Sequence, residues 1–143
     1  MYYLDANAFI YPALYKGPKA SATTDLLKQI VSGDVGGATA TLTIGEVVYI
    51  IGREEDRQTA IEQGRRILEL PNLQILDVKG MDVLQALSAM ETHTQLSPRD
   101  AIHYGTMREN GIHTIVSDDE DFDEVADVSR QPLESIPTGE SST

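Results

Sequence analysis

Four acidic positions have the surroundings of chemically active carboxylates. Glu46 is the only charged residue in the apolar segment Thr41–Ile51. Burial of an unpaired carboxylate is costly, so Glu46 needs a positive partner, either a distant arginine or a bound cation. The other acids lie at segment ends beside apolar runs: Asp5, Asp100 and a cluster with Asp118, Asp119 and Asp121. Together they favour the cation.

Strand-like and helix-like segments alternate along the chain and must position these acids. Expected strands cover residues 2–5, 38–40, 73–78 and 113–116. One expected helix ends near residue 14, and the others cover residues 20–32, 42–52, 57–70, 81–94 and 97–110. Strands separated by helices predict an α/β fold, with a mostly parallel central sheet flanked by helices.

The predicted order of elements brings the acids to one edge of the sheet. Ligands of such sheets bind at the carboxyl ends of the strands. Asp5 closes the first strand, and Asp118 and Asp119 follow the last one. Asp100 begins the helix before that strand, and Glu46 lies one turn into the helix after the second. We therefore expect the four positions to converge.

Each acid except Glu46 also has a purely structural explanation. Asp5 is suited to cap the following helix, and Ser97-Pro98-Arg99-Asp100 fits a capping box with Ser97 as N-cap. Residues 118–123 suit a solvated acidic turn. Caps and solvated turns do not account for an acid in an apolar helix. The combination therefore favours a metal site.

Composition limits the size and setting of the protein. The chain has 143 residues, 41% of them hydrophobic, which suits one domain over residues 1–137. The polar residues 138–143 are expected to be disordered. No apolar stretch approaches the roughly 20 residues of a membrane span, so we expect a soluble, cytoplasmic protein. The absence of cysteine excludes disulfides, cysteine zinc sites and a thiol nucleophile.

The charge balance is strongly acidic. There are 23 acidic and 11 basic residues, a net charge of -12, and only four of the basic residues are lysines. Such a surface is typical of proteins that work in very high salt, where screening mutes self-repulsion. A merely acidic cytosolic protein is the alternative. In either case, the negative net charge argues against binding of a polyanion through a broad basic patch.

Four motifs, in order and spacing, resemble those of PIN-domain nucleases over residues 2–132. They are Leu4–Ile10, the embedded Glu46, Leu96–His103 and Ile115–Phe122. The resemblance implies Asp5, Glu46, Asp100 and Asp119 as the four acidic positions, with Asn7 and Ser117 as polar helpers and Asp121 as an additional acid. The register of Ser117-x-Asp119-x-Asp121-Phe122 assigns Asp119 rather than Asp118.

The resemblance also implies an activity. Compact members are similar to VapC-type toxins, Mg²⁺- or Mn²⁺-dependent ribonucleases that a small antitoxin holds silent, and the implied fold is a PIN-like three-layer sandwich. By this resemblance we expect single-stranded or looped RNA as substrate, a homodimer and an antitoxin partner. An apolar surface from the helices at residues 20–32 and 42–52 would suit the dimer or the antitoxin.

Electrostatics supports the cation independently. Carboxylates about 5 Å apart repel by roughly 3 kcal/mol per pair at an effective dielectric constant near 20, so the cluster needs a divalent cation or protonation. Oxygen ligands without cysteine select Mg²⁺ or Mn²⁺ over zinc. We expect one or two ions on Asp5, Asp100 and Asp119, with Glu46 partly through water.

Other residues have competing interpretations. Arg99, Arg53 and Arg57 suit either a phosphate contact or an ordinary surface position. His103, one turn after Asp100, suits a metal neighbour or a packed core histidine. A phosphoaspartate phosphatase would have an aspartate at Asn7, and a receiver domain would have a lysine on its last strand. The remaining alternative is a non-catalytic PIN-like module that binds metal or protein.

Overall fold

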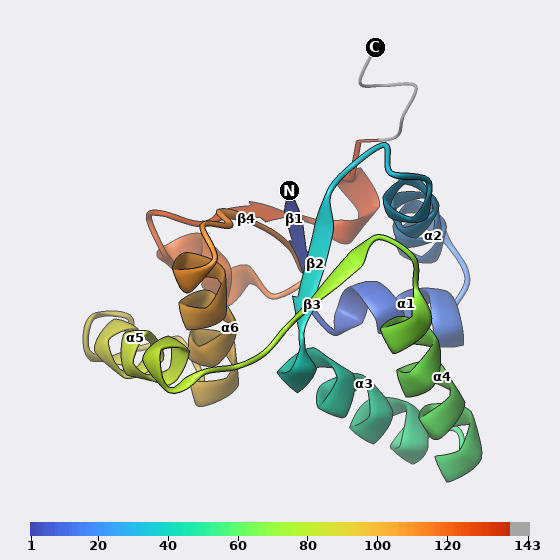
Figure 1. Ribbon diagram of the computed structural model, residues 1–143, viewed down its shortest axis with the longest axis horizontal. Helices are drawn as coiled ribbons and strands as arrows, with labels where there is room; N and C mark the ends of the chain where they lie inside the picture. Colours follow the sequence, from blue (N-terminus) through green and yellow to red (C-terminus); the bar gives the residue numbers. More distant parts are fainter. Residues whose placement is uncertain (138–143) are drawn as a thin grey trace.

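A parallel five-stranded sheet forms the centre of the molecule (Figure 1). The computed structural model describes residues 1–137. The strand order is β3-β2-β1-β4-β5, with every neighbouring pair parallel. The strands are β1 (Tyr2–Leu4), β2 (Gly37–Ala40), β3 (Leu73–Leu76), β4 (Thr114–Val116) and β5 (Ser129–Gln131). The predicted α/β class is confirmed.

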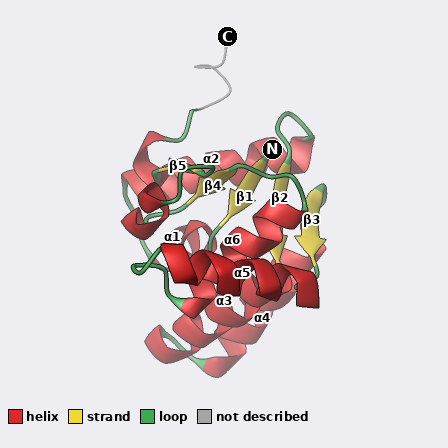
Figure 2. Ribbon diagram, turned by 90° about the vertical axis from the view of Figure 1, so that its left-hand side faces the viewer, coloured by secondary structure: helices red, strands yellow, loops and turns green. Residues whose placement is uncertain are grey.

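Six helices cover the two faces of the sheet. They are α1 (Asn7–Leu14), α2 (Pro18–Ser32), α3 (Thr41–Glu54), α4 (Arg57–Glu69), α5 (Gly80–Thr92) and α6 (Pro98–Glu109). Short 3-10 turns follow β4 and β5: η1 (Glu120–Glu124) and η2 (Leu133–Ser135). Figure 2 shows α5 and α6 in front of the sheet, on the side opposite α1 and α2. The boundaries differ from the predicted ones by a few residues at most.

Side chains that alternate in direction along the strands divide the core between the two faces of the sheet. Leu4 and Val116 pack with Leu26, Val47 and Ile51 on the side of α1 to α4. Their neighbours Tyr3 and Ile115 point the other way, into a cluster with Met107 of α6. Successive side chains of a strand point to opposite faces, so short apolar strands of this kind must be covered on both sides. The three layers follow from this pattern.

Strand β5 was not predicted. Its sequence Ser129-Arg130-Gln131 has no apolar residue, and its side chains are exposed or half-buried. It lies at the edge of the sheet, where one neighbouring strand and backbone hydrogen bonds suffice. Hydrophobic pattern therefore gives no sign of this strand.

Helix α5 packs against the core through small residues, and its leucines face outward. Ala86 and Ala89 are buried against α6, whereas Leu84 and Leu87 are 55% and 56% exposed. The reason is close packing, because a Cβ atom added at Gly105 of α6 would lie 2.1 Å from the carbonyl oxygen of Asp82. Small residues are required at this crossing, so the leucines face outward.

Two further expectations concern the ends and surface of the chain. The predicted disordered tail at residues 138–143 lies outside the described residues. Over residues 1–137, no helix combines the length and apolar character that a membrane crossing requires.

Candidate functional site

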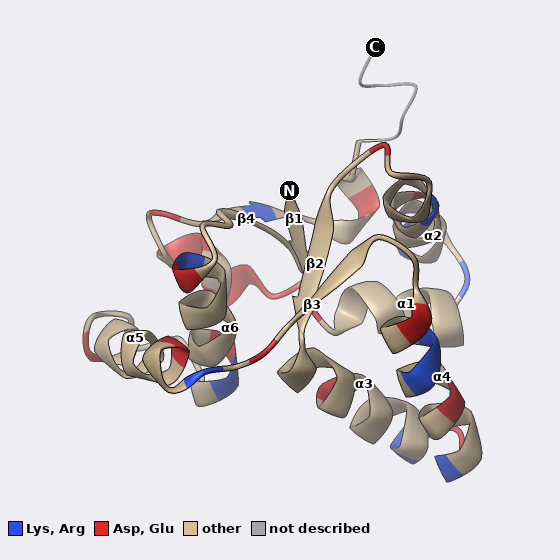
Figure 3. Ribbon diagram, viewed as in Figure 1, with Lys and Arg blue, Asp and Glu red and all other residues tan. Residues whose placement is uncertain are grey.

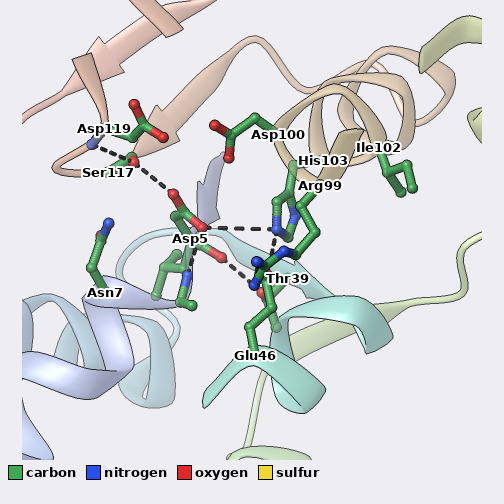
Figure 4. A network of polar contacts seen from close by, with 12 residues as sticks. Asp5, Asn7, Thr39, Glu46, Arg99, Asp100, Ile102, His103, Ser117 and Asp119 are labelled. Carbon is green, nitrogen blue, oxygen red and sulfur yellow. Dashed lines mark hydrogen bonds and ion pairs between the residues drawn. The ribbon is translucent and has the colours of Figure 1, made fainter. Parts of the chain in front are cut away.

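The four predicted acids lie together in a cleft of about 320 Å³ at the carboxyl ends of the strands. Asp5 directly follows β1, Asp119 follows β4, Glu46 belongs to α3 and Asp100 to the first turn of α6. Figure 3 shows acidic residues both on the segment after β4 and on α3. The expected convergence of these side chains is found, and Figure 4 shows them around one centre.

Asp5 is held rigidly at the floor of the cleft. Its Oδ1 accepts a hydrogen bond from the backbone N–H of Ala6 at 2.7 Å, and its Oδ2 accepts one from the Ser117 hydroxyl at 2.6 Å. The side chain is buried. Burial raises the pKa of Asp5, although His103 and Ser117 act in the opposite direction. Two fixed donors therefore orient this carboxylate before any ligand arrives.

Ser117 connects Asp5 to Asp119. The Ser117 hydroxyl oxygen accepts a hydrogen bond from the N–H of Asp119 at 3.0 Å while it donates to Asp5. Asp119 in turn accepts from the N–H of Asp121 at 2.9 Å and so caps η1. Asn7 accepts from the N–H of Asp118 at 3.3 Å. The two predicted polar helpers therefore fix the segment that carries Asp119.

Asp100 faces Asp119 across the opening. Ser97 caps α6 and accepts a hydrogen bond from the N–H of Asp100 at 3.1 Å, as predicted for the N-cap. Burial, then Asp119 and then Asp5, raise the pKa of Asp100 to about 7. The pKa of Asp121 is also raised, mainly by Asp119. These carboxylates lack compensating charge, which is the condition that a divalent cation relieves.

Glu46 has two partners within the protein. Its Oε1 lies 2.6 Å from Nε2 of His103, and its Oε2 lies 3.6 Å from the guanidinium of Arg99. The Glu46 side chain is 13% exposed and that of Arg99 is 62% exposed. Of the two partners considered for Glu46, the structure supplies the distant arginine and adds a histidine. A bound cation is therefore not needed to explain the burial of Glu46.

Sequence reasoning left His103 open as a metal neighbour or a packed core histidine, and it missed the contact of His103 with Glu46. His103 is fully buried, as a core histidine would be, but its ring lies between Glu46 and Tyr3 and 3.8 Å from Asp5. Burial lowers its pKa, yet Glu46 and Asp5 together outweigh that effect and raise it. The available signal was its position three residues after Asp100, which places both on one side of α6.

Several other candidates lie outside this cluster. Asp118 turns away and pairs with Lys19 of α2 at 2.9 Å. Arg53 and Arg57 line a separate cavity between α3 and α4, whereas Arg99 borders the acidic cleft. The structure therefore brings Arg99, but neither of the other two arginines, to the acids.

The largest apolar lining among the clefts described in residues 1–137 belongs to helices α1, α2 and α4. A cleft of about 590 Å³ lies between α1, α2 and α4, and its apolar lining includes Phe9, Leu27, Val31, Ile67 and Leu70. Helix α3 does not contribute to it. The surface expected from the helices at residues 20–32 and 42–52 stays a prediction: α2 lines this cleft, whereas α3 lines the separate cavity with Arg53 and Arg57.

The donor atoms suit a hard divalent cation. They form two groups whose ligand atoms lie within 4.8 Å of one another: Asp5, Glu46 and His103 in one, and Asp100, Asp119 and Asp121 in the other. Five of these six ligands are carboxylates, the type that Mg²⁺ and Mn²⁺ prefer. These ligands and the raised pKa of Asp100 fit the divalent cation that the sequence predicted.

Comparison with known proteins agrees with the fold. A family model described as PIN domain matches residues 2–128. VapC20 of Mycobacterium tuberculosis, a sarcin-ricin loop cleaving toxin, superposes with a TM-score of 0.73 at 16% identity, over 88% of this chain and 95% of that one.

Two further solved structures are similar as well. VapBC2 of Rickettsia felis, bound to promoter DNA, gives a TM-score of 0.71 at 12% identity, with 92% and 97% covered. FitAcB of Neisseria gonorrhoeae gives 0.69 at 18% identity, with 93% and 98% covered. No match is found among curated protein sequences.

Proposed function

Because this chain belongs to the PIN-domain family, we propose that it is a Mg²⁺- or Mn²⁺-dependent endoribonuclease and the toxin of a toxin-antitoxin pair. The observation that carries the proposal is the meeting of four carboxylates in one cleft, with the pKa of Asp100 raised to about 7. Such crowding is costly unless a cation or a proton neutralises it. We place the enzyme in the cytoplasm, with RNA as its substrate.

The metal would be held by Asp5, Asp100 and Asp119, with Glu46 partly through water and Asp121 beside them. When bound, Mg²⁺ or Mn²⁺ supplies an acidified water and neutralises the charge that develops on the phosphate. Ser117 keeps Asp5 and Asp119 in fixed orientation through its two hydrogen bonds. Arg99 is exposed at the edge of the cleft and would contact a phosphate of the RNA.

The partner proposal rests on the similarity to a toxin-antitoxin complex from Klebsiella pneumoniae and on the apolar cleft between α1, α2 and α4. Lys28 and Arg66 stand among the residues that line this cleft. An antitoxin segment with apolar side chains and a few acidic ones would complement it. We also expect a homodimer, and sedimentation of the purified chain tests that expectation directly.

Cleavage of mixed RNA tests the enzymatic proposal. The wild-type chain would be assayed with Mg²⁺, with Mn²⁺ and with EDTA, at low and molar salt, beside Asp5→Asn and the control Asp25→Asn. Asp25 is an exposed acid of α2, outside the cleft. We expect metal-dependent cutting by the wild type and the control, and none by Asp5→Asn. Metal binding without cutting under any condition would instead support a non-catalytic PIN-like module.

A further inference from the structure

The buried imidazole of His103 connects the protein core to the carboxylate of Glu46. Its Nδ1 lies 2.6 Å from the hydroxyl of Tyr3, and its Nε2 lies 2.6 Å from Oε1 of Glu46. Tyr3 and His103 are both fully buried and meet edge to face, with ring centroids 5.6 Å apart. Figure 4 shows the ring of His103 beside Asp5 and next to Glu46, with a dashed line to each.

The direction of these hydrogen bonds follows from the chemistry of the groups. An ionised carboxylate has only acceptors, so the Nε2 atom of His103 carries the hydrogen and donates to Glu46. Tyr3 can donate to Nδ1 or accept from it, and the bond to Glu46 is the same in both cases. The contact with Asp5 is 3.8 Å, too long for a hydrogen bond. Glu46 is therefore the acid that His103 holds.

The other tether of Glu46 is much weaker. Arg99 approaches Oε2 only to 3.6 Å and is 62% exposed, so solvent competes for its guanidinium. A glutamate side chain has several rotatable bonds, and restricting them before a ligand binds reduces the entropy lost at binding. The stronger restraint on Glu46 is therefore its contact with His103, which in turn contacts Tyr3 of β1.

We propose that His103 is a positioning residue, which fixes the carboxylate of Glu46 toward the metal centre and is itself fixed by Tyr3. This inference rests on the proposed function, because it concerns the same cleft. Residues that orient metal ligands typically contribute about 10- to 100-fold to metal affinity. The α6 motif thus supplies two functions one turn apart: Asp100 as a ligand and His103 as the support of another ligand.

A double-mutant cycle on Mn²⁺ affinity tests the proposal. Isothermal titration calorimetry would compare the wild type with His103→Leu, His103→Gln and Tyr3→Phe, and would repeat His103→Leu in a Glu46→Gln background. Glutamine keeps an N–H near the position of Nε2, whereas leucine removes it. Thermal unfolding of every variant, together with the paramagnetic resonance spectrum of bound Mn²⁺, separates loss of fold from loss of orientation.

We expect His103→Leu to weaken Mn²⁺ binding by about 10-fold, no more than Glu46→Gln does, because His103 acts only through Glu46. His103→Gln should restore most of that loss, and Tyr3→Phe should lose less than His103→Leu. In the Glu46→Gln background, His103→Leu should change the affinity by about twofold at most, because the group on which His103 acts is already altered.

Three results would overturn the inference alone, and a fourth would overturn the proposed function with it. An unchanged Mn²⁺ affinity in folded His103→Leu, beside a wild type that binds Mn²⁺ and cuts RNA, removes the positioning role alone. The same loss in both backgrounds shows that His103 acts independently of Glu46, as a ligand or as core packing. If His103→Leu does not fold, either of two results overturns it equally: a loss of Mn²⁺ affinity of about 10-fold or more in folded His103→Gln, or an unchanged affinity in Glu46→Gln. A wild type that binds no Mn²⁺ overturns the proposed function as well.

Discussion

The two halves of the acidic cleft contain the same kind of group but neutralise it differently. The inner half, Asp5 and Glu46, receives donors from the protein: Ala6, Ser117, His103 and Arg99. In the outer half, Asp100, Asp119 and Asp121 face one another, and within residues 1–137 no basic side chain forms an ion pair with them. Neighbours, more than residue type, decide which carboxylates need an external cation.

This difference assigns separate tasks to the halves. Carboxylates about 5 Å apart repel by roughly 3 kcal/mol at an effective dielectric constant near 20, and a divalent cation reverses that interaction. The outer half therefore gains most from metal binding. The inner half is already hydrogen-bonded, so its contribution is a fixed geometry around the metal centre.

The largest expected effect is on cleavage after Asp100→Asn. Because this change removes an uncompensated carboxylate of the outer half, we expect the cleavage rate to fall by about 1000-fold and Mn²⁺ affinity by about 100-fold. Glu46→Gln, in the inner half, should weaken Mn²⁺ binding by only about 10-fold. Initial cleavage rates and calorimetry measure both, with Asp25→Asn as the control. A larger loss of affinity for Glu46→Gln would contradict the division of tasks.

The second effect is on metal-free stability and has opposite signs in the two halves. The pKa of Asp100 is about 7 in the native protein against an ordinary value of 3.8. Between pH 3.8 and about pH 7, the native state binds the Asp100 proton more tightly than the unfolded state does. The contribution of Asp100 to the unfolding free energy is therefore fully present below pH 3.8 and is lost as the pH rises through about 7. Asp100→Asn removes this decline and should raise the unfolding free energy at pH 8 by about 2 kcal/mol.

Glu46→Gln should instead lower the unfolding free energy by about 2 kcal/mol, because His103 loses a charged acceptor. Urea unfolding in EDTA at pH 5 and pH 8 measures both variants. The raised pKa of His103 also makes stability fall with rising pH, so only the difference between wild type and Asp100→Asn isolates Asp100. A pH profile of Asp100→Asn parallel to that of the wild type would show that the outer half carries no such repulsion.

Much of the fold was predictable because short-range patterns determine it. The alternation of apolar strands and amphipathic helices predicted the parallel sheet, and four of its five strands were identified. Strand β5 was missed because an edge strand without apolar residues has no pattern of its own.

The site was likewise predictable in part: the meeting of the four acids was predicted, but the contacts of His103 were not. Asp5, Glu46, Asp100 and Asp119 were placed together because the ends of parallel strands share one edge. The contact between His103 and Glu46 joins residues 57 positions apart, and the one between Tyr3 and His103 joins residues 100 apart. From the sequence, His103 suited either a core position or a position beside the metal. Only the packing of α6 against β1 and α3 reveals that its two nitrogens are used for orientation.

The smallest expected effect is that of Asp118→Asn, and it tests where the outer half ends. Asp118 is adjacent to Asp119, but its carboxylate pairs with Lys19 at a partly exposed position. Exposed pairs of this kind contribute little, so we expect cleavage to stay within about twofold of wild type and the melting temperature to change little. Asp119→Asn is the matched comparison and should behave like Asp100→Asn. If Asp118→Asn abolished cleavage while Asp119→Asn did not, the acid opposite Asp100 would be Asp118, and the segment after β4 would have to shift by one residue when metal binds.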